Sequence, residues 1–332
     1  MRNLITLLSL SFLTCCQGQD KEMKIQLYSD PKIESNNLEN QINQNTEPET
    51  MKITDIKKKD YFAYMRSSNT QFEVLVDDVP VFRFFGKESK SGMGMNGDIP
   101  INSGLLKSGK HNIQGKMYPK YGNTSLVSRS YLTLEFSIRE SNTLNIHKLY
   151  EISPPDSHPN SDKTAIINPI EGLPYYELNT ELEVQLPFNI IGWTESVDLK
   201  KEMENGNDIK SEVKSAYDKI RQIIDKKDII GFSELIKERE ALLATAFYFT
   251  KDEEKKELEE FLDLIKNPDY ELAPYPAEAD LHFYGYGKLV TLFTKEREGV
   301  IKLINKKDPN EEIILDFYFH RKQKEEKLEV IL

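Results

Sequence analysis

The side chains that most often carry chemistry are sparse in this chain of 332 residues. Its five histidines are far apart in the sequence, and no HxH or HExxH pattern of a metal site occurs. They are His111, His147, His158, His282 and His320. No serine lies in a G-x-S-x-G turn, and the two cysteines, Cys15 and Cys16, are adjacent near the N-terminus. The sequence therefore predicts no metal site, no cofactor and no recognisable catalytic constellation.

Two of the histidines keep an enzymatic hypothesis open. His282 and His320 lie in predicted strands of one sheet, where they could converge with Asp280 or Asp316. An imidazole beside a carboxylate can act as a general acid or base. The alternative is that both histidines are separate residues, each facing solvent or hydrogen-bonded locally.

Aromatic residues are the other candidates for ligand contact. Tyr284 and Tyr286 add to an aromatic-rich stretch that could line a pocket on a concave sheet or simply pack in the core. Trp193, the single tryptophan, stands where a pattern of strands ends. We expect it to pack at the junction of two domains, with stacking on a sugar as the alternative.

The charge of the chain argues against one class of partner. The formal net charge is -11, whereas binding to nucleic acid requires a concentrated positive surface. We therefore expect no nucleic-acid partner.

The N-terminus carries the most specific signal in the sequence. Arg2 precedes an apolar stretch at residues 4–13, which suits a signal peptide and falls well short of the ~20 residues of a membrane span. The following Leu13-Thr14-Cys15-Cys16 resembles the lipobox of bacterial lipoproteins, with Leu13 at the expected spacing from Cys16. Cys15 departs from the small residue usual before the lipidated cysteine. Cleavage before Cys15 and a plain secretory signal are therefore the alternatives.

This resemblance implies a location. Acyl chains on Cys16 would anchor the protein stably to a membrane of the cell envelope. Within the lipoprotein family, Gln17 after the cysteine implies transfer to an outer membrane, if the host has one. We assign residues 1–16 to the signal peptide and lipidation site. Residues 17–55, rich in Gln, Asn, Glu and Lys, are assigned to a flexible polar tether.

Residues 56–195 have the pattern of an antiparallel β-sandwich. Apolar runs at 72–76 and 79–85 flank Asp77-Asp78, a two-residue hairpin turn, and residues 131–139 alternate between apolar and polar. Short strands separated by turn-rich loops are typical of sandwiches. The hairpin, loop and further strands over residues 76–119 are similar to jelly-roll accessory modules of carbohydrate-active proteins, which usually carry Asn-Gly where Asp77-Asp78 stands.

Residues 196–332 predict three helices followed by a curled antiparallel sheet. Apolar residues recur every three or four positions from Ile209 to Ile224, and a second helix is expected near 232–247. Thr250 and Glu253 form a capping box for the third helix, which should end before Pro268. Strands are expected at 279–284, 288–293, 300–305, 312–320 and 327–332. This element order, with the stretches 215–220 and 227–232, resembles nuclear transport factor 2-like domains. The fold class is therefore α+β.

These observations favour a lipid-anchored envelope protein that binds a protein or glycan partner without catalysis. One alternative is a hydrolase or isomerase that uses a pocket in the C-terminal domain. Another is an immunity-type lipoprotein that blocks a toxin through its acidic surface.

Overall fold

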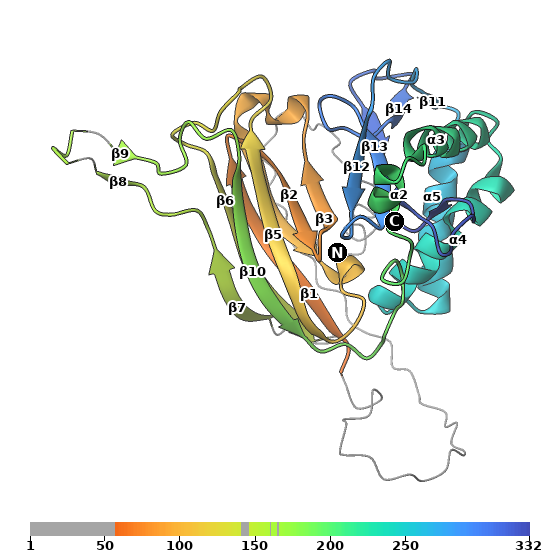
Figure 1. Ribbon diagram of the computed structural model, residues 1–332, viewed down its shortest axis with the longest axis horizontal. Coiled ribbons are helices and arrows are strands. Elements are labelled where there is room, and N and C mark those ends of the chain that lie inside the picture. Colours follow the sequence, from red (N-terminus) through yellow and green to blue (C-terminus); the bar gives the residue numbers. More distant parts are fainter. Residues whose placement is uncertain (1–56, 141–145, 160, 165) are drawn as a thin grey trace, which may run out of the picture.

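A computed structural model describes residues 57–140, 146–159, 161–164 and 166–332. The predicted signal peptide, Cys16 and the predicted tether lie outside the described residues. In Figure 1 a β-rich N-terminal part stands beside a C-terminal part of helices and smaller sheets. This arrangement confirms the α+β class with a mostly β N-terminal part.

The first sheet of the N-terminal part has four antiparallel strands. Their spatial order is β4 (Met93–Pro100), β1 (Lys59–Ser68), β6 (Tyr131–Glu140) and β7 (Ile146–Ile152). Side chains of successive strand residues point to opposite faces, so apolar residues at every second position can share one buried face. Tyr61, Ala63 and Met65 of β1 follow this rule and are buried.

The second sheet is also four-stranded and antiparallel. Its order is β10 (Tyr176–Val184), β5 (Gly109–Pro119), β2 (Thr70–Val76) and β3 (Val79–Phe84). The predicted hairpin turn between β2 and β3 is confirmed. Asp77 and Asp78 adopt φ angles of 48° and 64°, as a two-residue turn with the twist of a hairpin requires.

The two sheets enclose one apolar core, so the predicted sandwich is confirmed. Phe72 and Val74 from one sheet meet Leu134 and Phe136 from the other. Strand β2 is buried along nearly its whole length, on both faces, because the C-terminal part covers its outer side. A short pair of strands, β8 (His158–Pro159) and β9 (Ile166–Ile167), lies on an arm that projects from the sandwich on the side away from the helices (Figure 1).

Helices open the C-terminal part. They are α2 (Leu199–Glu204), α3 (Ile209–Asp225), α4 (Ile229–Ala246) and α5 (Lys251–Lys266). The last three match the three predicted helices, and α2 is an additional short one. Helices α2, α3 and α4 each begin at an aspartate whose carboxylate accepts a backbone N–H of the first turn. Helix α5 begins at the predicted capping box of Thr250 and Glu253.

The strands that follow form two antiparallel sheets rather than the single curled sheet that the sequence predicted. One sheet has the order β11 (Tyr270–Leu272), β14 (Ile301–Asn305) and β15 (Glu312–Leu315). The other has the order β12 (Asp280–Tyr284), β13 (Leu289–Phe293), β16 (Phe319–His320) and β17 (Glu329–Val330). The sheets touch through an isolated bridge between Phe293 and Gly299. They pack with α3, α4 and α5 around a core that includes Tyr217, Phe232 and Phe317.

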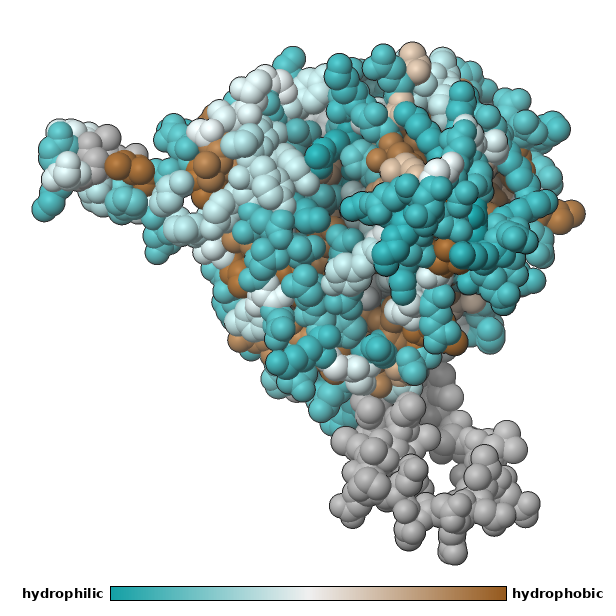
Figure 2. All heavy atoms as spheres, viewed as in Figure 1, coloured by the Kyte–Doolittle hydropathy of each residue, from teal (hydrophilic) through white to brown (hydrophobic). Residues whose placement is uncertain are grey.

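A third apolar cluster joins the two parts. Leu75 and Val79 of the sandwich pack with Tyr284 and Phe293 of the C-terminal part, and Trp193 belongs to the same cluster. The expected place of Trp193 at the junction therefore agrees with the structure. Hydrophilic side chains cover most of the face in Figure 2, with smaller hydrophobic patches between them. Among the described residues, no helix is long and apolar enough to span a membrane.

Candidate binding pocket at the junction

A pocket with a volume of about 100 Å³ lies between the two parts. Room on this scale accepts several water molecules or one group the size of a side chain. On the sandwich side its lining comes from β3, the end of β4 and a short 3-10 helix (Asn102–Gly104). On the other side it comes from α4, the segment after it, α5, the connection between β15 and β16, and the C-terminus. The lining residues are Pro80, Val81, Phe82, Arg83, Pro100, Ser103, Arg239, Glu240, Leu243, Phe247, Phe249, Glu257, Phe261, Asp316, Tyr318 and Leu332.

Arg83 is a charged residue of the pocket with several contacts across the junction. Its side chain is only 8% exposed, and its Nη1 lies 2.9 Å from Oδ2 of Asp316, across the junction. Its Nη2 donates to the backbone carbonyl of Arg297 at 2.7 Å. The guanidinium carbon also lies 3.5 Å from the ring centroid of Phe293, a cation–π arrangement. Burial alone would lower the pKa of Arg83, but the surrounding tyrosines and carboxylates outweigh it and raise that pKa.

Glu73 on β2 completes the network behind Arg83. Its Oε2 lies 3.7 Å from Nε of Arg83, and its carboxylate accepts the hydroxyls of Tyr118 and Tyr284, each at 3.0 Å. Burial and the Glu73 charge raise the pKa of Tyr284 well above its ordinary value, so its hydroxyl stays a proton donor. The two tyrosine hydroxyls thus satisfy this buried carboxylate by hydrogen bonds, and the positive charge of Arg83 lies beside it without one.

A second arginine reaches the pocket from α4. Arg239 is 4% exposed, its guanidinium carbon lies 5.4 Å from the ring centroid of Phe261, and it pairs with Glu240. The pocket therefore combines aromatic and aliphatic walls with charged groups that tertiary contacts already hold in position. Such a site can recognise a group that has an apolar body and a polar edge.

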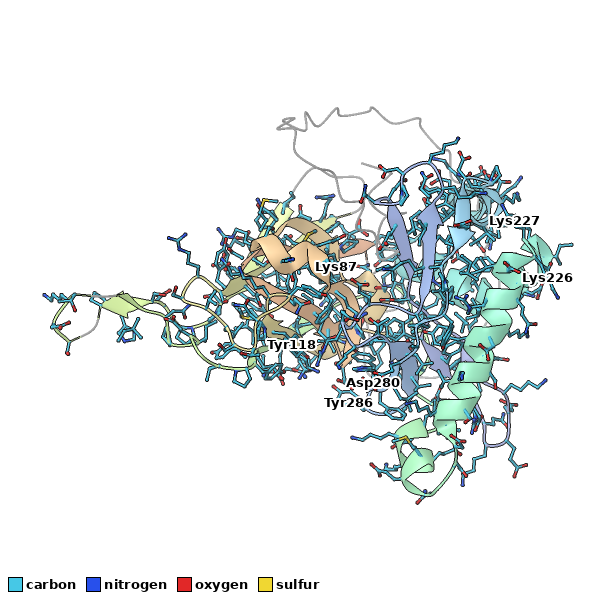
Figure 3. The ribbon with its side chains drawn as sticks, turned by 90° about the horizontal axis from the view of Figure 1, so that it is seen from above. Lys87, Tyr118, Lys226, Lys227, Asp280 and Tyr286 are labelled. Carbon is cyan, nitrogen blue, oxygen red and sulfur yellow. The ribbon has the colours of Figure 1, made fainter. Side chains whose placement is uncertain are left out.

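The aromatic residues predicted from sequence lie elsewhere on the junction. Tyr284 and Trp193 share the buried apolar cluster, and Trp193 is 4% exposed. Tyr286 is 63% exposed, and its backbone N–H donates to Asp78 across the junction. Figure 3 shows Tyr286 on the C-terminal side of the boundary and Tyr118 on the sandwich side. Neither Trp193 nor the two tyrosines line the pocket, and their role in ligand binding stays a prediction.

The two candidate histidines do not come together. His282 on β12 and His320 on β16 are separated by β13 and offset along it, which places their backbones more than roughly 10 Å apart. His282 is half-buried with its ring 5.1 Å from that of Phe293. Burial and the charges of Arg297 and Arg83 lower the pKa of His282. Asp316, one of the proposed partners, binds Arg83.

His320 has different partners from those expected. Its Nδ1 lies 2.8 Å from Oγ of Ser196, and its Nε2 lies 3.3 Å from Oε2 of Glu238. A hydroxyl, an imidazole and a carboxylate thus follow one another in a chain of contacts. Such an arrangement can activate a serine as a nucleophile when its hydroxyl faces a substrate. Here His320 is fully buried, Ser196 is 7% exposed, and neither lines the junction pocket. Burial, the largest influence, lowers the pKa of His320.

Arg83 and Arg239 were not predicted from the sequence, and Asp316 was expected only as a partner of the histidines. The sequence does single out Arg83, because this charged residue interrupts an otherwise apolar run at residues 79–85. A charged residue in such a run is rarely buried unless it is paired. The partner could not be found in the same way, because Asp316 is 233 residues away in the chain.

Comparison with protein-family models, curated proteins and solved structures yields no match to this chain.

Proposed function

We propose that this chain is an exported, lipid-anchored envelope protein that binds a protein or glycan partner without catalysing a reaction. The anchor rests on the lipobox-like sequence that ends at Cys16. Binding rests on one observation, the junction pocket that aromatic walls and the buried Arg83 and Arg239 create. These arginines place charge beside apolar walls, which suits a group with an apolar body and a polar edge.

The size of the pocket limits what enters it. A volume of about 100 Å³ suits one ring or one apolar side chain rather than a whole oligosaccharide. The partner would thus insert a single anchoring group between Phe82 and Leu243, and the rest of its contact would lie outside. Anchoring groups of this kind commonly dominate the affinity of protein interfaces.

The pocket can be closed by one substitution. Leu243 lies half-buried on α4 and lines the pocket, so Leu243→Trp adds volume directly inside it. Ala241 is on the exposed side of the same helix, and Ala241→Trp adds a tryptophan without entering the pocket. Circular dichroism would establish that both variants keep the fold.

The readout is native mass spectrometry of the full chain after incubation with detergent-free envelope extract. We expect a discrete added mass on the wild type and on Ala241→Trp, and its loss from Leu243→Trp. Sugar-sized steps would identify a glycan, and a protein-sized increment a protein partner. An increment that Leu243→Trp retains would contradict binding through the pocket.

The anchor has its own test. Metabolic labelling with a fatty acid should label the wild type and Cys15→Ala, whereas Cys16→Ala should lose the label completely. Undiminished labelling of Cys16→Ala would refute the assignment of the lipidated residue.

A further inference from the structure

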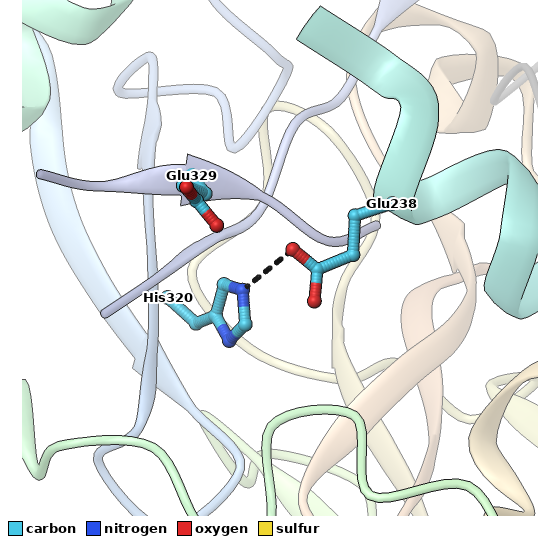
Figure 4. A group of neighbouring side chains, drawn as sticks. All are labelled: Glu238, His320 and Glu329. Atoms are coloured by element: carbon cyan, nitrogen blue, oxygen red, sulfur yellow. Dashed lines mark hydrogen bonds and ion pairs between the residues drawn. The ribbon is translucent and has the colours of Figure 1, made fainter. Parts of the chain in front are cut away.

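A second cluster of polar side chains lies apart from the residues that line the junction pocket. Glu238 of α4, His320 of β16 and Glu329 of β17 each offer one ligand atom, and these atoms all lie within 4.8 Å of one another. Figure 4 shows the three side chains directed toward a common centre. The cluster thus joins α4 to two consecutive strands near the C-terminus.

The spacing of these atoms fits a small divalent ion. Two ligand atoms about 2.0–2.1 Å from a tetrahedral zinc ion are roughly 3.4 Å apart. Nε2 of His320 and Oε2 of Glu238 are 3.3 Å apart. Only a small closing movement of Glu329, whose side chain is 53% exposed, would bring its oxygen to the same distance.

The surroundings of His320 also suit a metal ligand. Histidines that bind metals use their other ring nitrogen in a hydrogen bond that fixes the ring. Nδ1 of His320 lies 2.8 Å from Oγ of Ser196, which leaves Nε2 directed toward the carboxylates. His320 is the buried member of the cluster, whereas the side chains of Glu238 and Glu329 are partly exposed to solvent.

One cation already occupies the front of the cluster. Nζ of Lys322 lies 2.8 Å from Oε2 of Glu238 and 2.8 Å from Oε2 of Glu329. The two carboxylates therefore concentrate enough negative charge to hold a cation between them. The Lys322 side chain is half exposed, so it can turn into solvent when a divalent ion takes its place.

We propose that Glu238, His320 and Glu329 bind a divalent transition-metal ion of the zinc type, in competition with the ammonium group of Lys322. Zinc accepts both imidazole nitrogen and carboxylate oxygen as ligands, and water can complete the coordination. The imidazole disfavours magnesium and calcium, which prefer oxygen ligands alone. The bound ion would join α4 to the C-terminal strands, so it would also stabilise the folded state.

The test is isothermal titration of the full chain in detergent with Zn²⁺. Every version carries Cys15→Ser and Cys16→Ser, so that no thiol contributes to binding. The test variants are Glu329→Gln, which removes a ligand charge at an exposed position, and Lys322→Ala, which removes the competing ammonium. Glu325→Gln and Lys324→Ala are the matched controls, because they make the same charge changes at exposed positions of the same segment.

The chain that carries only the two Cys→Ser changes serves as the wild type in this test. We expect one Zn²⁺ per chain in this wild type and in both controls. Glu329→Gln should weaken binding by at least ~10-fold, as is typical when a metal site loses a supporting group. Lys322→Ala should tighten binding several-fold. With Co²⁺ as the probe, a visible absorption band should appear in the wild type and be weaker in Glu329→Gln. This band reports on metal coordination even if the heat of binding in the titration is small.

Three outcomes would overturn the proposal. The first is that neither the wild type nor Lys322→Ala binds Zn²⁺ at millimolar concentration. The second is that Glu329→Gln binds as tightly as Glu325→Gln. The third is that only Lys322→Ala binds, because the native lysine would then hold the site permanently. None of these outcomes depends on the junction pocket, so the proposed partner binding is tested separately.

Discussion

Replacing Arg83 by methionine should destabilise the protein far more than removing an exposed ion pair. Methionine keeps much of the apolar length of the side chain and can stay against Phe293. The buried Asp316 and Glu73 lose their nearest cation, however. Breaking a buried pair by removal of one partner costs about 3–5 kcal/mol. At about 2–4 °C per kcal/mol for a chain of comparable size, the melting temperature should fall by roughly 6–20 °C.

Arg66→Met is the matched control for this prediction. Nη2 of Arg66 lies 2.8 Å from Oε2 of Glu151, but the two side chains are 46% and 35% exposed. Exposed pairs typically contribute about 0–1 kcal/mol. Urea unfolding followed by circular dichroism would compare the two variants. A double-mutant cycle of Arg83→Met with Asp316→Asn should show a coupling above about 1 kcal/mol. The reasoning is refuted if Arg83→Met costs no more than Arg66→Met.

Two smaller predictions concern α5 and the sandwich edge. Thr250→Ala removes the hydroxyl that accepts the backbone N–H of Glu253 and donates to its carboxylate, so urea unfolding should show a loss of about 0.5–2 kcal/mol. An unchanged midpoint would contradict the role of this cap. Burial, with Glu298 and Glu312, raises the pKa of Glu88 from 4.5 to about 7. The folded state therefore holds the extra proton between these values, and stability should fall as pH rises from 4.5 to about 7 and then level off. The melting temperature of Glu88→Gln should therefore decrease less than that of the wild type between pH 4.5 and about 7. Identical pH profiles for the two proteins would show that the pKa of Glu88 is not raised.

Local features of this fold could be predicted from the sequence because their causes lie within a few residues. The turn at Asp77 and Asp78 depends on two residues that tolerate positive φ between two apolar runs. The start of α5 depends on Thr250 and Glu253, which bond each other's backbone. The apolar spacing of α3 determines which of its faces is buried, and Ile209, Val213, Tyr217, Ile220 and Ile224 are buried as expected.

The division of the C-terminal strands could not be predicted in the same way. Each strand has an apolar pattern that suits either one continuous sheet or two. In the structure β14 pairs with β11 and β15, whereas β13 pairs with β12 and β16. Strand β11 is only three residues long and carries no periodicity that a sequence pattern could reveal.

The sequence by itself thus determined the fold class, the hairpin and the two ends of α5. Export and anchoring at Cys16 stay predictions from the sequence. Only the tertiary structure decided which charged residues meet. Arg83 binds Asp316, which is 233 positions away in the sequence, and His320 contacts Glu238, which is 82 positions away. The physical reason is that a charge adds little to local propensity, whereas its partner is chosen by how the sheets and helices pack. For this protein the candidate sites therefore arise at the contacts between elements rather than within any one of them.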